Sequence, residues 1–149
     1  MAQEQRISRK GARPFDFPTD HRVQLSFASM AGLWTLRFGL FGCRDEETEG
    51  GILHIEGDRM AGADGYFLLH GRFEIRDGGI DVAAQTVRHR SGSPFDAVYH
   101  HPEPIFPIAY RAEAISGDHL EGRIQQPGQP DMRIVMRRFR DLGRDSRLV

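Results

Sequence analysis

This sequence has little of the residue types and patterns on which a functional assignment usually depends. It contains one cysteine, Cys43, which excludes an internal disulfide and fits a reducing cytosol. No run approaches the roughly 18 consecutive apolar residues of a membrane-spanning helix. The chain also does not start with the basic and then apolar layout of a secretory signal. We therefore expect a cytoplasmic protein that does not use a membrane as its partner.

The chain also lacks an excess of positive or negative charge. The chain has 20 basic and 21 acidic residues, with a net charge of -1 and Lys10 as its only lysine. The field of the whole molecule therefore gives no reason to expect a nucleic acid as partner. The most basic segment lies near the C-terminus, but Phe139 is the only aromatic ring there on which a base could stack. We expect nucleic acid to be an unlikely partner.

Catalytic and metal-binding motifs are missing as well. The sequence holds neither a Gly-x-Ser-x-Gly nucleophile elbow nor a phosphate-binding loop. The closest group of metal-ligating types is His100, His101 and Glu103, where neighbouring side chains of an extended loop point apart and do not converge on one ion. His54 and His70 fall on outward faces of expected strands. We expect no enzymatic activity, no metal and no cofactor.

What the chain does have is an alternation of apolar and polar residues, from Gly32 to Met136, that restarts after each Gly- and Asp-rich turn. Alternating residues of a strand face opposite sides, so each segment predicts a strand with one buried face. We expect strands near residues 32–40, 50–55, 60–64, 66–76, 80–90, 108–115, 120–125 and 131–139. Eight sequential strands with mostly short connections favour an all-β, antiparallel up-and-down barrel, with a two-sheet sandwich as the alternative.

The turns and the ends of the chain complete this prediction. Asp77-Gly78-Gly79 is a strong hairpin signal because glycine accepts a positive φ angle. A long loop with four prolines is expected from Ser91 to Pro107. Residues 1–29 lack periodicity and predict a flexible extension, residues 30–140 the barrel domain, and residues 141–149 a tail.

The interior of an eight-stranded barrel is just wide enough for packed side chains or one small ligand. The inward-facing residues that would either line a cavity or fill it are Trp34, Leu36, Phe38, Phe67, Phe73 and Tyr110. Burying each of the five aromatic rings among them contributes about 1.5–3 kcal/mol to folding, which favours filling. A carrier of a small apolar ligand remains the alternative function.

Short glycine-based motifs add a family resemblance. Gly32-Leu33-Trp34, Gly51-Ile52-Leu53, the run from Gly57 to Asp64 and a central hairpin that ends at Arg88-His89-Arg90 resemble the GrlR-like proteins, bacterial negative regulators of type III secretion. The resemblance covers about residues 31–139. It implies a lipocalin-like eight-stranded barrel that forms a homodimer and acts by binding another protein, not by catalysis.

In the family's named regulator, an acidic motif on the central hairpin matters for capturing a transcriptional activator. The corresponding hairpin here, Arg76-Asp77-Gly78-Gly79, keeps one acid. A second acidic group lies in the loop after the first expected strand. The candidate partner-binding residues are Asp45, Glu46, Glu47, Glu49, Arg76 and Asp77. We expect a regulatory or binding protein that acts through protein–protein interaction.

Overall fold

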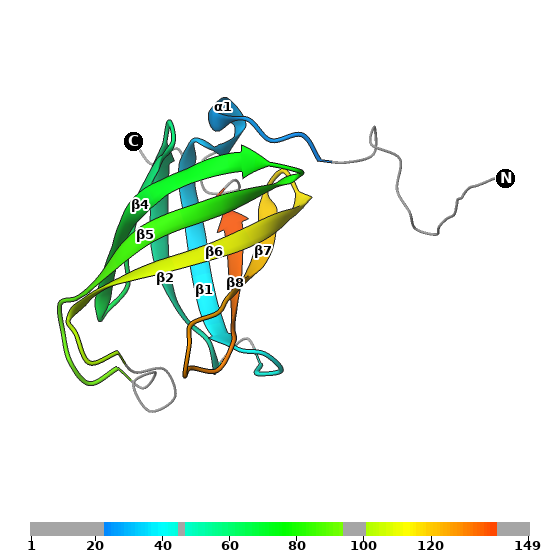
Figure 1. Ribbon diagram of the computed structural model, residues 1–149. Helices are drawn as coiled ribbons and strands as arrows, with labels where there is room; N and C mark the ends of the chain where they lie inside the picture. Colours follow the sequence, from blue (N-terminus) through cyan, green and yellow to red (C-terminus); the bar gives the residue numbers. More distant parts are fainter. Residues whose placement is uncertain (1–22, 45–46, 94–100, 140–149) are drawn as a thin grey trace, which may run out of the picture.

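The computed structural model describes residues 23–44, 47–93 and 101–139. They form a closed barrel of eight antiparallel strands, in which each strand pairs with its sequence neighbours and β8 pairs with β1 (Figure 1). The predicted up-and-down barrel is therefore confirmed. The elements are α1 (Phe27–Met30), β1 (Gly32–Leu40), β2 (Glu49–Glu56), β3 (Arg59–Ala63), β4 (Phe67–Arg76), β5 (Gly79–Arg88), β6 (Ile105–Ser116), β7 (His119–Ile124) and β8 (Met132–Arg138).

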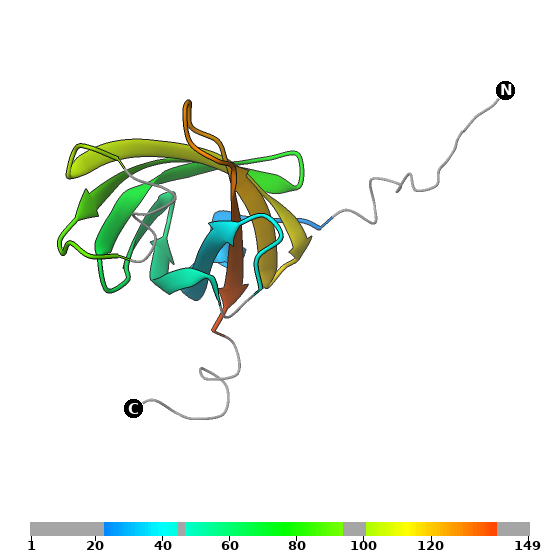
Figure 2. The same ribbon diagram turned by 90° about the horizontal axis from the view of Figure 1, so that it is seen from below.

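The alternation of the sequence explains which side chains point inward. Along β5, the buried residues Ile80, Val82 and Thr86 recur at even spacing, whereas Ala83 and Gln85 between them are exposed. The same alternation holds in β8, whose buried residues are methionine and isoleucine and whose outer residues are mostly arginine. The buried faces of the strands meet in one core inside the ring, which is seen end-on from below in Figure 2.

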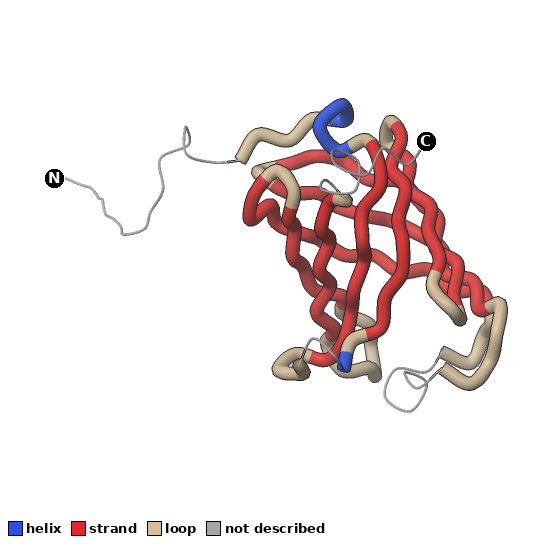
Figure 3. The backbone as a smooth tube through the Cα atoms, turned by 180° about the vertical axis from the view of Figure 1, so that it is seen from behind, coloured by secondary structure: helices blue, strands red, loops and turns tan. Residues whose placement is uncertain are grey.

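Helix α1 lies across one end of the barrel (Figure 3). The side chains of Ser26 and Ser29 form a capping box that satisfies free N–H groups at the start of this helix. Met30 at its end is fully buried, and its carbonyl accepts a hydrogen bond from the indole Nε1 of Trp34 at 2.8 Å. Arg138 of β8 donates to the carbonyls of Ser29 and Ala31. The helix is thus tied to both β1 and β8.

The turn between β4 and β5 has the geometry that its sequence predicts. Asp77 and Gly78 both have positive φ, 51° and 77°, as a two-residue hairpin that follows the twist of the strands requires. Gly79 then begins β5, where a Cβ atom would lie 2.4 Å from the carbonyl oxygen of Ala112. This hairpin is at the same end of the barrel as α1.

Three segments differ from the sequence prediction. Strand β6 begins at Ile105, three residues earlier than expected, and therefore contains Pro107. Only β5 pairs with this part of β6, and proline is tolerated in a strand at such an unpaired edge.

Glu49, which was expected in a loop, belongs to β2. Of the expected N-terminal extension, residues 23–29 include part of α1 and Leu25, which packs against the core. The rest of it, and the expected tail 141–149, lie outside the described residues.

Candidate functional site

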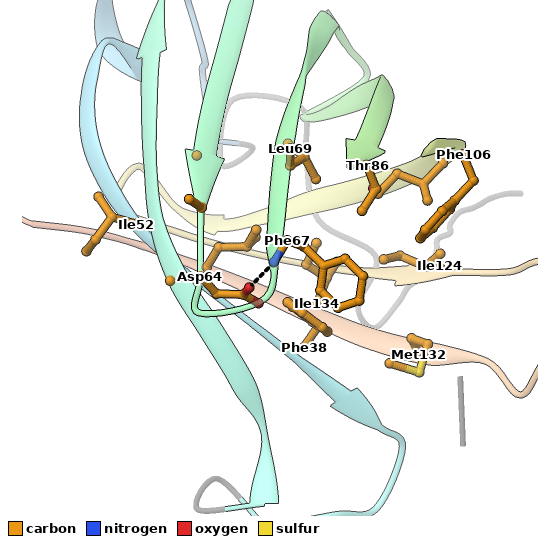
Figure 4. A pocket seen from close by; sticks show the side chains of 15 residues that line it. Phe38, Ile52, Asp64, Phe67, Leu69, Thr86, Phe106, Ile124, Met132 and Ile134 are labelled. Atoms are coloured by element: carbon orange, nitrogen blue, oxygen red, sulfur yellow. Dashed lines mark hydrogen bonds between the residues drawn. The ribbon is translucent and has the colours of Figure 1, made fainter. Parts of the chain in front are cut away.

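The interior of the barrel is hollow at the end opposite α1. A cavity of about 80 Å³, counted as the space that the centre of a water-sized sphere can reach, lies there and is partly open to solvent. Residues from all eight strands line it (Figure 4), namely Leu36, Phe38, Gly51, Ile52, Gly62, Ala63, Asp64, Phe67, Leu69, Thr86, Phe106, Ile108, Ile124, Met132 and Ile134.

Two glycines account for part of this space. A Cβ atom on Gly51 of β2 would lie 2.0 Å from the carbonyl oxygen of Ala63, and one on Gly62 of β3 would lie 2.2 Å from that of Ile52. Such distances are far shorter than any real contact, so neither position tolerates a side chain at this strand spacing. The walls formed by β2 and β3 therefore contribute little bulk to the cavity.

One polar atom inside the cavity is unsatisfied. Thr86 lies on the inner face of β5 with 8% of its surface exposed, and its hydroxyl oxygen is buried with no hydrogen-bond partner among the described residues. Its neighbours on the adjacent strands are Leu69 and Phe106, both apolar. A buried polar group without a partner costs about 1–3 kcal/mol. A bound molecule with a polar atom at this place would recover part of that cost.

Aromatic rings and cationic groups frame the mouth of the cavity. Phe67 and Phe106 meet edge to face, with ring centroids 6.4 Å apart. The Arg88 guanidinium lies over the Phe67 ring, 5.3 Å from its centroid, and the His101 ring stacks on Phe106 at 4.4 Å. Arg88 Nη1 also donates to the His101 carbonyl at 3.4 Å. The mouth thus combines an apolar inner layer with a polar outer layer.

The turn between β3 and β4 positions Phe67 beside the cavity. Asp64 Oδ1 accepts hydrogen bonds from the backbone N–H groups of Tyr66 at 2.8 Å and Phe67 at 2.7 Å. Figure 4 shows the second of these bonds. A ring nitrogen of His89 lies 3.1 Å from the Asp64 carbonyl oxygen. One aspartate therefore links the turn to the segment that follows β5.

Three of the six residues predicted to line or fill an interior cavity lie at this site. Leu36 and Phe38 of β1 and Phe67 of β4 line the cavity. Phe38 and Phe67 are only partly buried, as expected for side chains beside an opening. The structure thus brings together residues that are far apart in the sequence.

The other three predicted residues belong to the filled part of the interior. Trp34 is fully buried, and Phe73 packs edge to face with Phe27 of α1 at 5.5 Å. The Tyr110 hydroxyl lies 3.8 Å from the Met136 sulfur, and burial raises the pKa of this phenol well above its usual value of 10. These side chains fill space that a ligand would otherwise occupy.

The candidate partner-binding acids after β1 are exposed or half-buried where they are described. Glu47 accepts hydrogen bonds from the Arg44 backbone N–H at 2.8 Å and from Arg44 Nη2 at 3.1 Å, which lower the pKa of its carboxyl. Glu49 is half-buried in β2, opposite Phe38. Asp45 and Glu46 lie outside the described residues.

The hairpin candidates Arg76 and Asp77 lie at the other end of the barrel. The Arg76 guanidinium pairs with Asp77 at 3.0 Å and with Asp81 at 2.8 Å. The hydrogen bond from Arg76 lowers the pKa of the Asp81 carboxyl. Because this hairpin shares its end with α1, whereas Glu47 follows β1 at the opposite end, the structure does not bring the two candidate groups together.

Some residues of the cavity were missed by the sequence interpretation. Phe106 was assigned to a proline-rich loop, whereas Ile124, Met132 and Ile134 were placed in strands without a proposed role. Thr86 belongs to the strand expected at residues 80–90, where it shares the face of the apolar Ile80 and Val82. Its polarity on that face is the available signal, because threonine is mostly an exposed residue.

The wall of the barrel also carries an exposed apolar row, here named the outer stripe. Its members are cross-strand neighbours on the outer faces of β2 to β6, namely Ile52, Ala63, Leu68, Val87 and Ile105. Ile52 and Ala63, although exposed on this face, also border the opening of the cavity. Leu68 and Ile105 are 46% and 56% exposed. By contrast, the outer faces of β7 and β8 carry ion pairs such as Glu121–Arg133 at 3.2 Å.

Within residues 23–44, 47–93 and 101–139, no three histidine, cysteine or acidic side chains gather as metal ligands would. His54 and His70 are exposed on outer faces, and His100 lies outside these ranges. No helix in the same ranges is long and apolar enough to cross a membrane.

No protein-family model matches this chain, and no curated protein matches it. Among solved structures, the chain is similar to a mutant of the vaccine antigen transferrin binding protein B from Haemophilus parasuis Hp5. The two share 12% sequence identity with a TM-score of 0.36, and the match covers 77% of this chain and 28% of that one. This chain therefore spans less than a third of the length of that protein.

Proposed function

We propose that this protein binds a small, largely apolar molecule inside the barrel, at the end opposite α1. The observation that carries the proposal is the partly open cavity of about 80 Å³ whose apolar lining holds the unsatisfied Thr86 hydroxyl. A ligand site of this kind is concave and mostly apolar, with a few polar groups that orient the ligand. A ligand in this cavity would remove the apolar lining from water, which favours binding.

The test is a titration with N-phenylnaphthylamine, a neutral dye that fluoresces in apolar surroundings. Leu69 lines the cavity, and Leu68 beside it points to solvent, so Leu69→Trp and Leu68→Trp form a matched pair on one strand. We expect Leu69→Trp to abolish saturable dye binding and Leu68→Trp to retain it. Equal binding by both variants would contradict an internal site, and circular dichroism melting of both checks that the barrel still folds.

A direct search for a natural ligand complements the dye. The protein is purified without detergent, extracted with organic solvent, and the extract is analysed by mass spectrometry. Enrichment of one apolar compound with the wild type, but not with Leu69→Trp, supports the carrier function.

The outer stripe favours a second candidate, a regulatory protein that pairs with a second copy of itself. A symmetric dimer needs a self-complementary surface, and an uncharged apolar row faces its own copy without repulsion between like charges. The resemblance to GrlR-like regulators also implies a dimer that binds another protein. In this candidate the wall that carries Leu68 forms the interface. The basic wall around Val135 of β8, whose cross-strand neighbour is Arg37 of β1, remains outside this interface.

Sedimentation equilibrium at micromolar concentration tests this second candidate. We expect a species of twice the 16.9 kDa chain mass for the wild type and a single chain for Leu68→Lys. Ala83→Lys, which adds the same charge on the outer face of β5 away from the stripe, should leave the dimer intact. A wild type that sediments at 16.9 kDa would exclude the dimer.

A further inference from the structure

Two polar side chains follow one another on the inner face of β5 as the strand approaches the cavity mouth. Thr86 lines the cavity, and Arg88 is the next residue of the same parity, opposite Phe67 of β4. Residues two positions apart in a strand are about 7 Å apart. One small ligand can therefore contact both side chains.

The position of Arg88 places its charge at the mouth. Its guanidinium lies over the ring of Phe67, and its Nη1 donates to the carbonyl of His101. Phe67 and Phe106, the ring on which His101 stacks, both line the cavity. The cation is thus held against the aromatic rings that border the apolar space.

Among the described residues, the charged groups at this end of the barrel besides Arg88 include Asp64, Arg90 and Glu103. Asp64 uses its Oδ1 atom to accept the N–H groups of Tyr66 and Phe67. Arg90 lies over the ring of Tyr66 at 5.1 Å, which adds a second cation at the same end of the barrel. The exposed carboxylate of Glu103 belongs to the segment that precedes β6.

We propose that the cavity binds a medium-chain alkyl carboxylate, with its chain among the apolar residues and its carboxylate on Arg88. The proposal rests on the ligand-binding function proposed above and adds the chemical class of the ligand. Guanidinium groups match carboxylates through two parallel hydrogen bonds. The Thr86 hydroxyl donates a further hydrogen bond to the ligand or to a water that the ligand holds. Because the cavity of about 80 Å³ is partly open to solvent, it encloses one part of an eight-carbon chain, and the remainder of the chain lies in the opening.

The experiment compares three molecules with the same chain and different head groups. Octanoate, octanol and octylamine are each titrated against the complex of the protein with N-phenylnaphthylamine at pH 7.5, and displacement of the dye gives each affinity. We expect octanoate to bind about tenfold more tightly than octanol, because a charged hydrogen bond is the stronger one. Octylamine should bind more weakly than octanol, since its ammonium group meets a cation.

Variants at β5 assign the head-group preference to Arg88. In Arg88→Gln, octanoate should fall to the affinity of octanol, while octanol itself is unchanged. Arg88→Lys keeps the charge without the planar fork and should retain part of the preference. The matched control is Arg90→Gln, which removes a cation from the same end but outside the cavity and should change octanoate affinity by less than about twofold.

The outcomes separate the two proposals. If the dye binds and octanol displaces it as well as octanoate does, the cavity is a ligand site but the carboxylate proposal is wrong. An equal loss in Arg88→Gln and Arg90→Gln would show a general attraction of anions and would likewise overturn the contact at Arg88. Absence of dye binding to the wild type would remove both proposals.

Discussion

The two ends of this barrel are built from the same alternating strands, yet one is filled and the other is hollow. At the α1 end, Trp34 and Met30 are fully buried, and the Trp34 indole donates a hydrogen bond to the Met30 carbonyl. At the opposite end, some inner positions are occupied by the small residues Gly51, Gly62 and Thr86, and a cavity remains. The alternation of apolar and polar residues therefore decides which side chains face inward. The sizes of a few inward-facing side chains decide whether that part of the interior is a packed core or a cavity.

The largest expected effect is the loss of a large side chain from the filled end. Trp34→Ala should lower the free energy of unfolding by about 3–5 kcal/mol, because it leaves a void that the surrounding core cannot close. Phe67→Ala, an aromatic truncation beside the existing cavity, should cost less than half as much, since that ring is only partly buried. Urea denaturation of both variants measures the difference. Equal losses would contradict the division into a packed and a hollow end.

A second pair of variants concerns the attachment of α1. Arg138 donates to Asp118 at 2.8 Å, to Ala31 at 2.8 Å and to the Ser29 carbonyl, with 12% of its side chain exposed. Removing these charged hydrogen bonds in Arg138→Ala should cost about 1.5–3 kcal/mol.

The matched control for Arg138 is at the opposite end. Arg123 covers the ring of Phe41 at 4.3 Å and pairs with Asp131 at 2.7 Å, but half of its side chain is exposed. Arg123→Ala should therefore cost about 0–1 kcal/mol. Thermal melting and amide hydrogen exchange of both variants provide the comparison. Unchanged exchange at Met30 and Ala31 in Arg138→Ala would show that this residue does not hold the helix.

A third change should raise stability. Thr86→Val removes a buried hydroxyl that has no partner among the described residues and keeps the shape of the side chain, so the ligand-free protein should gain about 1 kcal/mol. Thr35→Val is the control, because the Thr35 hydroxyl donates to the Arg137 carbonyl at 3.3 Å and loses that bond. Chemical denaturation of delipidated protein measures both. A destabilised Thr86→Val would indicate that the hydroxyl is satisfied, for instance by ordered water.

The smallest expected effect is the acid dependence of the filled end. Hydrogen bonding from Arg76 lowers the pKa of Asp81 from its ordinary 3.8. The pair therefore contributes stability above about pH 3.8 that is lost as the pH falls further toward the folded-state pKa. Asp81→Asn should remove this small acid-dependent component and leave ligand binding unchanged. Denaturation midpoints between pH 6 and 2.5 compare the two proteins, and identical profiles would contradict a paired Asp81.

The architecture could be predicted from the sequence because it depends on local patterns. The even spacing of Ile80, Val82 and Thr86 places these residues on one face of their strand. The Asp77-Gly78 pair predicts a tight turn because the segments on both sides of it have the pattern of strands. Strand β6 was shortened in the prediction because Pro107 resembles a loop residue, and its tolerance at an unpaired edge depends on where β7 ends. That information is not local.

The site could be predicted only in part, for a related reason. Leu36 and Trp34 are both inward-facing residues of β1, and only the stagger of the strands and the position of α1 decide which of them meets empty space. The missing partner of Thr86 depends on Leu69 and Phe106, which neighbour it from other strands. Such contacts become visible only when the register of all eight strands is known.

The most direct test of the account observes both ends of the barrel in one experiment. Isoleucine methyl signals are recorded by NMR while N-phenylnaphthylamine is added to the wild type. Ile108, Ile124 and Ile134 line the cavity, whereas Ile55 and Ile80 are buried at the α1 end. The account predicts saturable shifts of the first three signals and little change in the other two. Shifts confined to exposed isoleucines, or none at any of these five, would contradict a ligand site inside the barrel.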